Sequence, residues 1–136
     1  MSVEDILKEV CELNESEGIY PLSKRQVANI LNEILRYRVT DLEDIRIALE
    51  YSVKMRAQIM FSINHITKPY KPIYNWYTSM RYPVAKVLSI MGIENIEYNM
   101  PPYEDFNIIN IKDGIALIEM ELKDRIKPKK MIKKLY

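Results

Sequence analysis

The chain has 136 residues, with 20 Lys and Arg against 19 Asp and Glu, and it contains one His, one Cys and three Gly. These counts exclude an internal disulfide, a zinc site of Cys/His type and the glycine-rich loops that hold phosphates. A net charge of +1 is also unlike a chain covered in nucleic-acid-binding surface. We therefore expect one domain with no catalytic centre, no cofactor and no metal site.

Two amphipathic helices are expected near the start of the chain. Ser2 can cap the first helix, with Asp5 three residues later, and Ser23 with Gln26 has the form of a capping box for the second. Gly18 separates the two helices. Apolar residues follow each start at helical spacing: Val3, Ile6, Val10 and Leu13, then Val27, Ile30, Leu31, Ile34 and Leu35.

A long third helix is expected from Thr40, with Glu43 completing a second capping box, to about Ile66. Its apolar face covers a wide arc, so this helix should need partners on more than one side. Arg56 falls on the apolar seam. Its head either reaches water along a packed stem or pairs with a carboxylate of another subunit.

A fourth helix is expected from Ile73 to about Tyr82, and Pro83 either kinks it or opens a fifth helix that ends at Gly92. Five aromatic residues cluster around the fourth helix, where core packing, a protein interface or stacking on single-stranded nucleic acid would each use them. They are Tyr70, Tyr74, Trp76, Tyr77 and Tyr82.

The pattern changes after the fifth helix. Residues 99–105 contain two adjacent prolines and are expected to form a linker. Two β-prone runs follow, Phe106–Lys112 and Ile115–Leu122, and the Asp113-Gly114 pair between them predicts a β-hairpin. The expected fold is therefore mainly α, of α+β class. A bundle of four to five helices spans residues 1–98, and a small β segment with a basic tail spans residues 106–136.

The basic tail, Lys123 to Tyr136, holds seven positive charges and one negative charge, which leaves the rest of the chain mildly acidic. It can contact nucleic-acid phosphates, an acidic protein surface or only water. The residues expected to make such a contact are Lys127, Lys129, Lys130, Lys133 and Lys134.

The order of these features resembles subunits of the GINS replication complex in which a helical domain precedes a small β domain. The resemblance runs through Arg46-Ile47-Ala48-Leu49-Glu50-Tyr51-Ser52-Val53-Lys54-Met55-Arg56 on the long helix, then Tyr74-Asn75-Trp76-Tyr77 and Ile93-Glu94-Asn95-Ile96-Glu97. Met100-Pro101-Pro102 and Phe106-Asn107-Ile108-Ile109 then look like the linker and the entry to the β domain.

The resemblance implies a non-enzymatic scaffold that assembles with a second GINS-type subunit, as a hetero-tetramer, and couples the MCM helicase to a Cdc45/RecJ-like partner. It implies a cytoplasmic, nucleoid-associated protein, and no stretch is long enough to cross a membrane. The subunit interface is expected at Arg46, Leu49, Tyr51, Arg56, Ile59, Tyr74, Trp76 and Tyr77.

Two other interpretations remain open. In the first, the chain is a small nucleic-acid-binding protein whose hairpin is a wing and whose basic tail contacts phosphates. In the second, it is an accessory or viral interaction protein.

Overall fold

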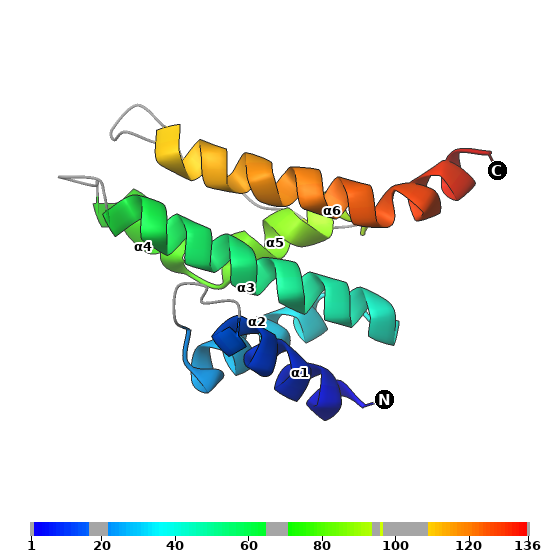
Figure 1. Cartoon of the computed structure of the whole chain (residues 1–136), viewed down its shortest axis with the longest axis horizontal. Helices are drawn as coiled ribbons and strands as arrows, with labels where there is room; N and C mark the ends of the chain where they lie inside the picture. Colours follow the sequence, from blue (N-terminus) through cyan, green and yellow to red (C-terminus); the bar gives the residue numbers. More distant parts are fainter. Residues whose placement is uncertain (1, 17–21, 65–70, 94–95, 97–108, 136) are drawn as a thin grey trace.

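The structure is a computed structural model, and it describes residues 2–16, 22–64, 71–93, 96 and 109–135. The described part of the chain forms six helices and contains no strand (Figure 1). The helices are α1 (Val3–Ser16), α2 (Lys24–Arg36), α3 (Leu42–Asn64), α4 (Lys71–Thr78), α5 (Arg81–Ile90) and α6 (Ile109–Leu135). The mainly helical character expected from the sequence is confirmed.

The starts of α1 and α2 follow from their capping residues. At α2, the Gln26 backbone N–H donates to the Ser23 hydroxyl (3.2 Å) and the Ser23 N–H donates to the Gln26 side chain (2.8 Å), which confirms the capping box. Ser2 and Asp5 exchange the equivalent bonds at α1. The bond donated by the Ser2 backbone N–H is the main cause of a lowered pKa of the Asp5 carboxyl.

The start of α3 differs from the prediction by one residue. The Asp44 backbone N–H donates to the side chain of Asp41 at 3.0 Å, and α3 begins at Leu42, so Asp41 is the cap in place of Thr40. Asp and Thr are both good capping residues, and two adjacent candidates allow either start.

Helix α3 lies at the centre of the molecule, with α6 on one side and α1 and α2 on the other (Figure 1). Two core clusters meet on it, which confirms that it needs partners on more than one side. Each cluster takes a different face of α3: Ile45, Ala48, Leu49 and Val53 pack with α1, α2 and α5, while Ile47, Tyr51, Met55, Ile59 and Ile63 pack with α4, α5 and α6.

Helices α4 and α5 are separated by a short break at residues 79 and 80, earlier than the expected end near Tyr82. Pro83 lies in the first turn of α5, where its missing N–H removes no helical bond, so it opens a fifth helix. Gly92 has φ +80, and the Gly92 and Ile93 N–H groups donate to Ser89 and Leu88 carbonyls. This is a Schellman ending, and it confirms Gly92 as the stop signal.

The predicted β-hairpin is wrong, because residues 109–135 form the single helix α6. The inward residues of α6 follow helical spacing and are buried against α3 and α5: Ile111, Ile115, Ile118, Leu122 and Ile126. Gly114 is buried, and a Cβ added there would lie 3.2 Å from the Cβ of Gln58 on α3. The glycine therefore allows a close approach between two helices, in place of the turn that Asp113-Gly114 predicted. The predicted linker, residues 99–105, lies outside the described residues.

Candidate functional site

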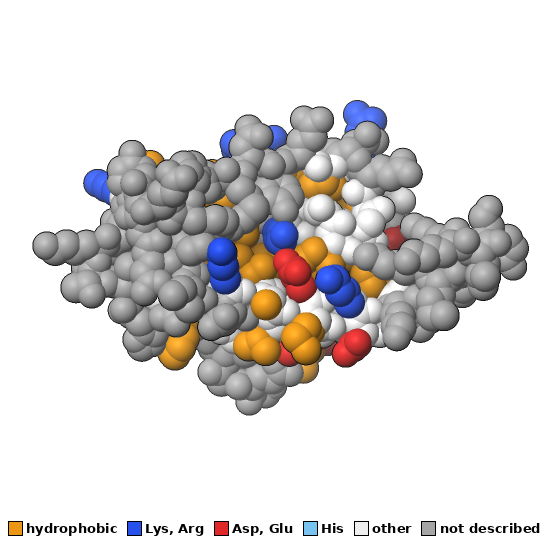
Figure 2. All heavy atoms as spheres, turned by 90° about the horizontal axis from the view of Figure 1, so that it is seen from above, with side chains coloured by type: hydrophobic (Ala, Val, Ile, Leu, Met, Phe, Trp, Pro, Cys, Tyr) orange, Lys and Arg blue, Asp and Glu red, His pale blue; other side chains and the backbone are white. Residues whose placement is uncertain are grey.

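The outer face of α6 carries exposed apolar side chains. Leu117 is 56% exposed and Met120 is 64% exposed, which makes them the two most exposed large apolar side chains of the described residues. They are three residues apart, so they share one side of the helix, opposite the buried isoleucines. Figure 2, which looks down on α6, shows apolar side chains at the surface among basic and acidic ones. Ala116 is also exposed and lies on the same side of the helix as Met120. We call Ala116, Leu117 and Met120 the outer face of α6.

Ion pairs hold α6 to its neighbours on both edges. On the α3 edge, Lys54 Nζ lies 3.7 Å from Glu121 Oε2, and Arg125 lies 3.8 Å from Glu43 and 4.0 Å from Glu50. These pairings show that α3 and α6 run antiparallel, as Figure 1 also shows. Each pair is partly exposed and is worth a fraction of a kcal/mol, roughly 0.2–1. The buried apolar residues of α6 decide which side of the helix faces inward, and these pairs lie at the edge of that contact.

A further ion pair joins the other edge of α6 to α5. Lys86 Nζ lies 3.3 Å from Glu119 Oε1, and both side chains are about three-quarters buried or more. Two acidic residues of α6, Glu119 and Glu121, thus each lie within 4 Å of a lysine of the same chain, and Lys54 also lies 3.6 Å from Glu50.

The predicted interface arginines are bound within the chain. Arg46 Nη2 donates to Glu9 Oε1 at 2.8 Å, which joins α3 to α1, and Arg46 also lies 3.9 Å from Glu43. Arg56 is 8% exposed, and its Nε donates to the Thr78 carbonyl at 3.1 Å. That carbonyl ends α4, where the helix dipole favours a positive charge. Arg56 is therefore buried rather than directed to water along its stem.

The other predicted interface residues are packed in the chain's own core. Leu49, Tyr51, Ile59 and Tyr77 are buried, and Tyr74 and Trp76 pack against the same cluster with partial exposure. The rings of Trp76, Tyr77 and Tyr82 form a compact group with centroids 4.3 to 5.0 Å apart. Burial raises the pKa of the Tyr51 phenol. The apolar residues on which the predicted subunit interface was based are thus used in the chain's own core. The subunit interface itself stays a prediction.

The predicted lysine contacts lie in the last turns of α6. The backbone of this segment is helical to Leu135, and in Figure 1 it continues past the other helices toward the C-terminus. The side chains of Lys127, Lys129, Lys130, Lys133 and Lys134 are outside the described part of the structure.

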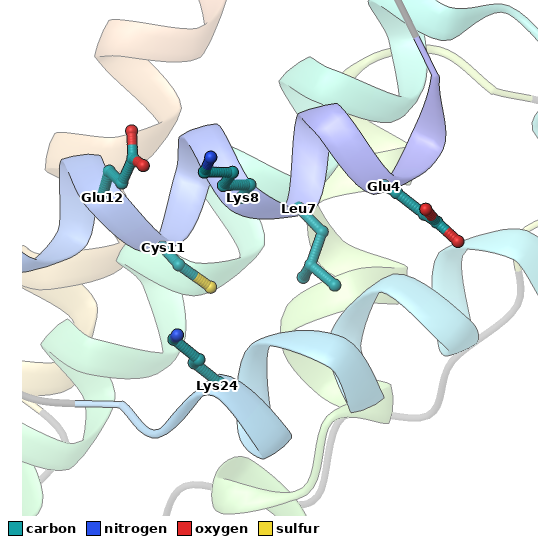
Figure 3. A pocket seen from close by; sticks show the side chains of 6 residues that line it. All are labelled: Glu4, Leu7, Lys8, Cys11, Glu12 and Lys24. Carbon is teal, nitrogen blue, oxygen red and sulfur yellow. The ribbon is translucent and has the colours of Figure 1, made fainter.

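A groove of about 380 Å³ lies between α1 and α2 (Figure 3). Its lining combines two glutamates, two lysines, a leucine and the thiol of Cys11, which is 9% exposed and belongs to the core. Figure 3 shows the Cys11 and Lys24 side chains directed toward each other from the two helices. His65, the single imidazole, lies outside the described residues.

Among the residues that the structure describes, no three His, Cys, Asp or Glu side chains are grouped to hold a metal ion. No helix in this part of the chain has the length and apolar content to cross a membrane. Comparison with protein-family models, with curated proteins and with solved structures gave no match.

Sequence reasoning missed Leu117 and Met120 as surface residues. The signal was present in Ile115–Leu122, where five of eight residues are large and apolar. A helix can bury only one side against a neighbour, so a run this rich in apolar residues leaves some of them exposed. The strand interpretation concealed this, because it assigned the same residues to two faces of a hairpin.

Proposed function

We propose that this protein is a non-enzymatic interaction subunit, and that it binds another protein through the outer face of α6. The supporting observation is the pair of exposed side chains, Leu117 and Met120, on a helix whose opposite face already fills the core. Exposed apolar side chains grouped on one face, bordered by polar groups, are typical of protein contact sites.

The ion pairs of α6 support the same proposal. A contact surface binds tightly when its side chains are already in place before the partner arrives. Lys54, Lys86 and Arg125 add to the buried core contacts that hold α6 in place, so Leu117 and Met120 are presented on an anchored helix.

A finer form of the proposal assigns the chain to a GINS-type replication scaffold. In this form it assembles with a second GINS-type subunit and couples the MCM helicase to a Cdc45/RecJ-like protein. The sequence order of α3 and α4, with Arg46, Tyr51, Arg56 and the aromatic group, supports it. Because α6 stands where the hairpin was expected, the GINS assignment depends on the helical part of the resemblance alone. In this proposal α6 makes the contacts that were expected of the β segment.

The nucleic-acid alternative loses its wing, since Asp113 and Gly114 lie inside α6. The alternative of an accessory or viral interaction protein agrees with the proposed binding surface and differs only in the partner that it would bind.

The proposal is tested by purifying the N-terminally tagged chain from its own organism with whatever it binds. The variant Leu117→Asp/Met120→Asp should lose a protein that the wild type retains. The matched control is Leu35→Asp, since Leu35 is 38% exposed and lies on α2, away from α6. Recovery of MCM or a RecJ-like protein would support the finer form. Equal recovery of all partners by the α6 variant, or recovery of none by the wild type, would refute the proposal.

A further inference from the structure

Helix α2 presents a polar face to solvent, and it lies on the side of α3 opposite α6 (Figure 1). The apolar residues of α2 are buried, and positions 25, 29, 32 and 36 follow one another along the opposite side at helical spacing. These positions hold two arginines with two asparagines between them: Arg25, Asn29, Asn32 and Arg36. Asn29 is partly exposed and the other three are exposed. We call these four residues the outer ridge of α2.

The surface around the outer ridge is positively charged. The side chain of Arg36 is 65% exposed, and one of its N–H groups donates to the Glu33 carboxylate at 3.0 Å. A guanidinium has five N–H donors, so others still face water. Arg38 follows the helix and is exposed as well. The segment 24–38 contains four basic residues and one acidic residue, Glu33, which gives it a net charge of +3.

Two of these arginines occupy positions that are unfavourable for the stability of α2. Arg25 lies in the first turn, which has no acidic residue, although the helix dipole disfavours positive charge at this end. Arg38 has φ 59, a left-handed conformation that glycine adopts at lower cost after a helix. Unfavourable local choices of this kind are typical of positions where the side chain is needed for function. The placement of both arginines therefore indicates that their side chains contact a ligand.

The dimensions of the outer ridge fit the major groove of DNA. Eleven residues separate Arg25 from Arg36, which corresponds to about 16 Å along the helix and to about five base pairs of B-DNA. The major groove is about 12 Å wide and admits an α-helix. Arginines bind phosphates, and asparagine amides bind base edges, adenine in particular. Two amides between two arginines are thus the order of groups that a helix in this groove requires.

Other anionic partners match the outer ridge less well. The ridge has no large apolar side chain, whereas the centre of a protein contact site and a helix bound to a membrane both use apolar groups. The major groove of an RNA duplex is too narrow for side chains to read. Exposed Glu4 and Glu12 line the groove between α1 and α2, where they repel phosphates. This repulsion favours contact at the outer ridge over contact at the α1 edge.

We propose that α2 binds the major groove of double-stranded DNA through its outer ridge. Arg25, Arg36 and Arg38 bind phosphates, and the two asparagines face the base edges. Within the described residues α2 and α6 do not contact each other, so this site is separate from the outer face of α6. The inference goes beyond the proposed function, and it lets one molecule hold DNA on one side of α3 and a protein on the other.

The test is fluorescence anisotropy of the full-length protein with a labelled 16-base-pair DNA duplex at several salt concentrations from 0.05 to 0.2 M. Arg25→Gln/Arg38→Gly should weaken binding at least tenfold at 0.1 M salt. The slope of log K against log salt should become shallower by about 1.8, because each lost phosphate contact contributes about 0.9. Both changes favour the folded state, so unfolding cannot explain the loss, and the Tm checks this.

The matched control is Lys71→Gln/Arg81→Gln, which removes the same charge from exposed positions on α4 and α5. It should change the affinity by less than about twofold and leave the salt slope as it is. A second measurement identifies the groove. A duplex whose cytosines carry bulky substituents at carbon 5 has a filled major groove, and it should bind at least tenfold more weakly than the unmodified duplex.

Several results would overturn the inference. They are no binding of the duplex by the wild type, an equal loss in the α2 variant and the control, and unchanged affinity for the duplex with the filled groove. A loss confined to Lys127→Glu/Lys134→Glu would place the DNA contact on α6. Equal affinity for an RNA duplex or for polyglutamate would reject the major groove in favour of a general attraction to anions. Each of these results leaves the proposed protein contact at the outer face of α6 intact.

Discussion

Replacing Leu122 with alanine should destabilise the protein strongly, whereas replacing Met120, two residues away, should have almost no effect. Leu122 is fully buried in the cluster between α3 and α6, and Met120 is 64% exposed. Leucine and methionine have nearly equal helix propensities, so both changes alter the helix itself by the same amount. The difference between the two variants therefore isolates the packing of α6 on α3.

The expected magnitudes follow from burial. Truncating a buried leucine to alanine costs about 2–5 kcal/mol, because transfer free energy is lost and a cavity remains. An exposed methionine changes stability by less than about 0.5 kcal/mol. For a chain of this length, a loss of about 3 kcal/mol lowers the Tm by roughly 10 °C.

Thermal unfolding followed by circular dichroism at 222 nm measures both variants against the wild type. A helix separates positions 120 and 122 by 200°, but a strand directs both to the same face. If Met120→Ala lowered the Tm as much as Leu122→Ala, residues 120 and 122 would share one face, as in a strand, and the helical account of this segment would be refuted.

Three further predictions concern single residues. Arg38 follows α2 with φ 59, a conformation that favours glycine, so Arg38→Gly should raise the free energy of unfolding by about 0.5–1 kcal/mol in urea denaturation; a loss would contradict the strain. Ser52 is fully buried, and its hydroxyl has no hydrogen-bond partner in the described part of the chain, so Ser52→Ala should stabilise by about 1 kcal/mol; destabilisation would indicate a hidden partner. Burial raises the pKa of Tyr51 above its ordinary value of 10.0. The unfolded chain then loses this proton first as the pH rises, so stability should fall above about pH 10, and less steeply in Tyr51→Phe. Identical alkaline slopes for the two proteins would refute the assignment to Tyr51.

Local signals predicted the start of α2 and the end of α5 well. The Ser23 and Gln26 capping box and the Gly92 stop depend on a few neighbouring residues, and the structure has both. The start of α3 shifted to Asp41 because two adjacent residues can each act as the cap. Such features are set by backbone hydrogen bonds within one turn, which a sequence shows directly.

Features set by tertiary contacts were predicted less well. Asp113-Gly114 between β-prone runs is the usual pattern of a hairpin, but Gly114 serves the close approach of α6 to Gln58 on α3. Likewise, the wide apolar arc of α3 predicted partners on more than one side, and this chain's own α6 is one of them. In both cases the sequence showed that a partner surface was needed, and only the fold showed which one.

The candidate site combines one feature that could be predicted from the sequence with one that depends on the fold. The basic end of α6 could be recognised from composition, because charge counts do not depend on the fold. The exposure of Leu117 and Met120 depends on which face of α6 packs on α3, so it became visible only with the helix in place.

The measurement that tests the central claim most directly is site-specific photo-cross-linking in the organism that encodes the chain. A photoreactive amino acid is placed at position 120 on α6, or at position 35 on α2 as the control, in the otherwise unchanged protein. The account predicts a discrete protein adduct from position 120 that is absent from position 35. Adducts to nucleic acid alone, no adduct from position 120, or the same adduct from both positions would contradict it.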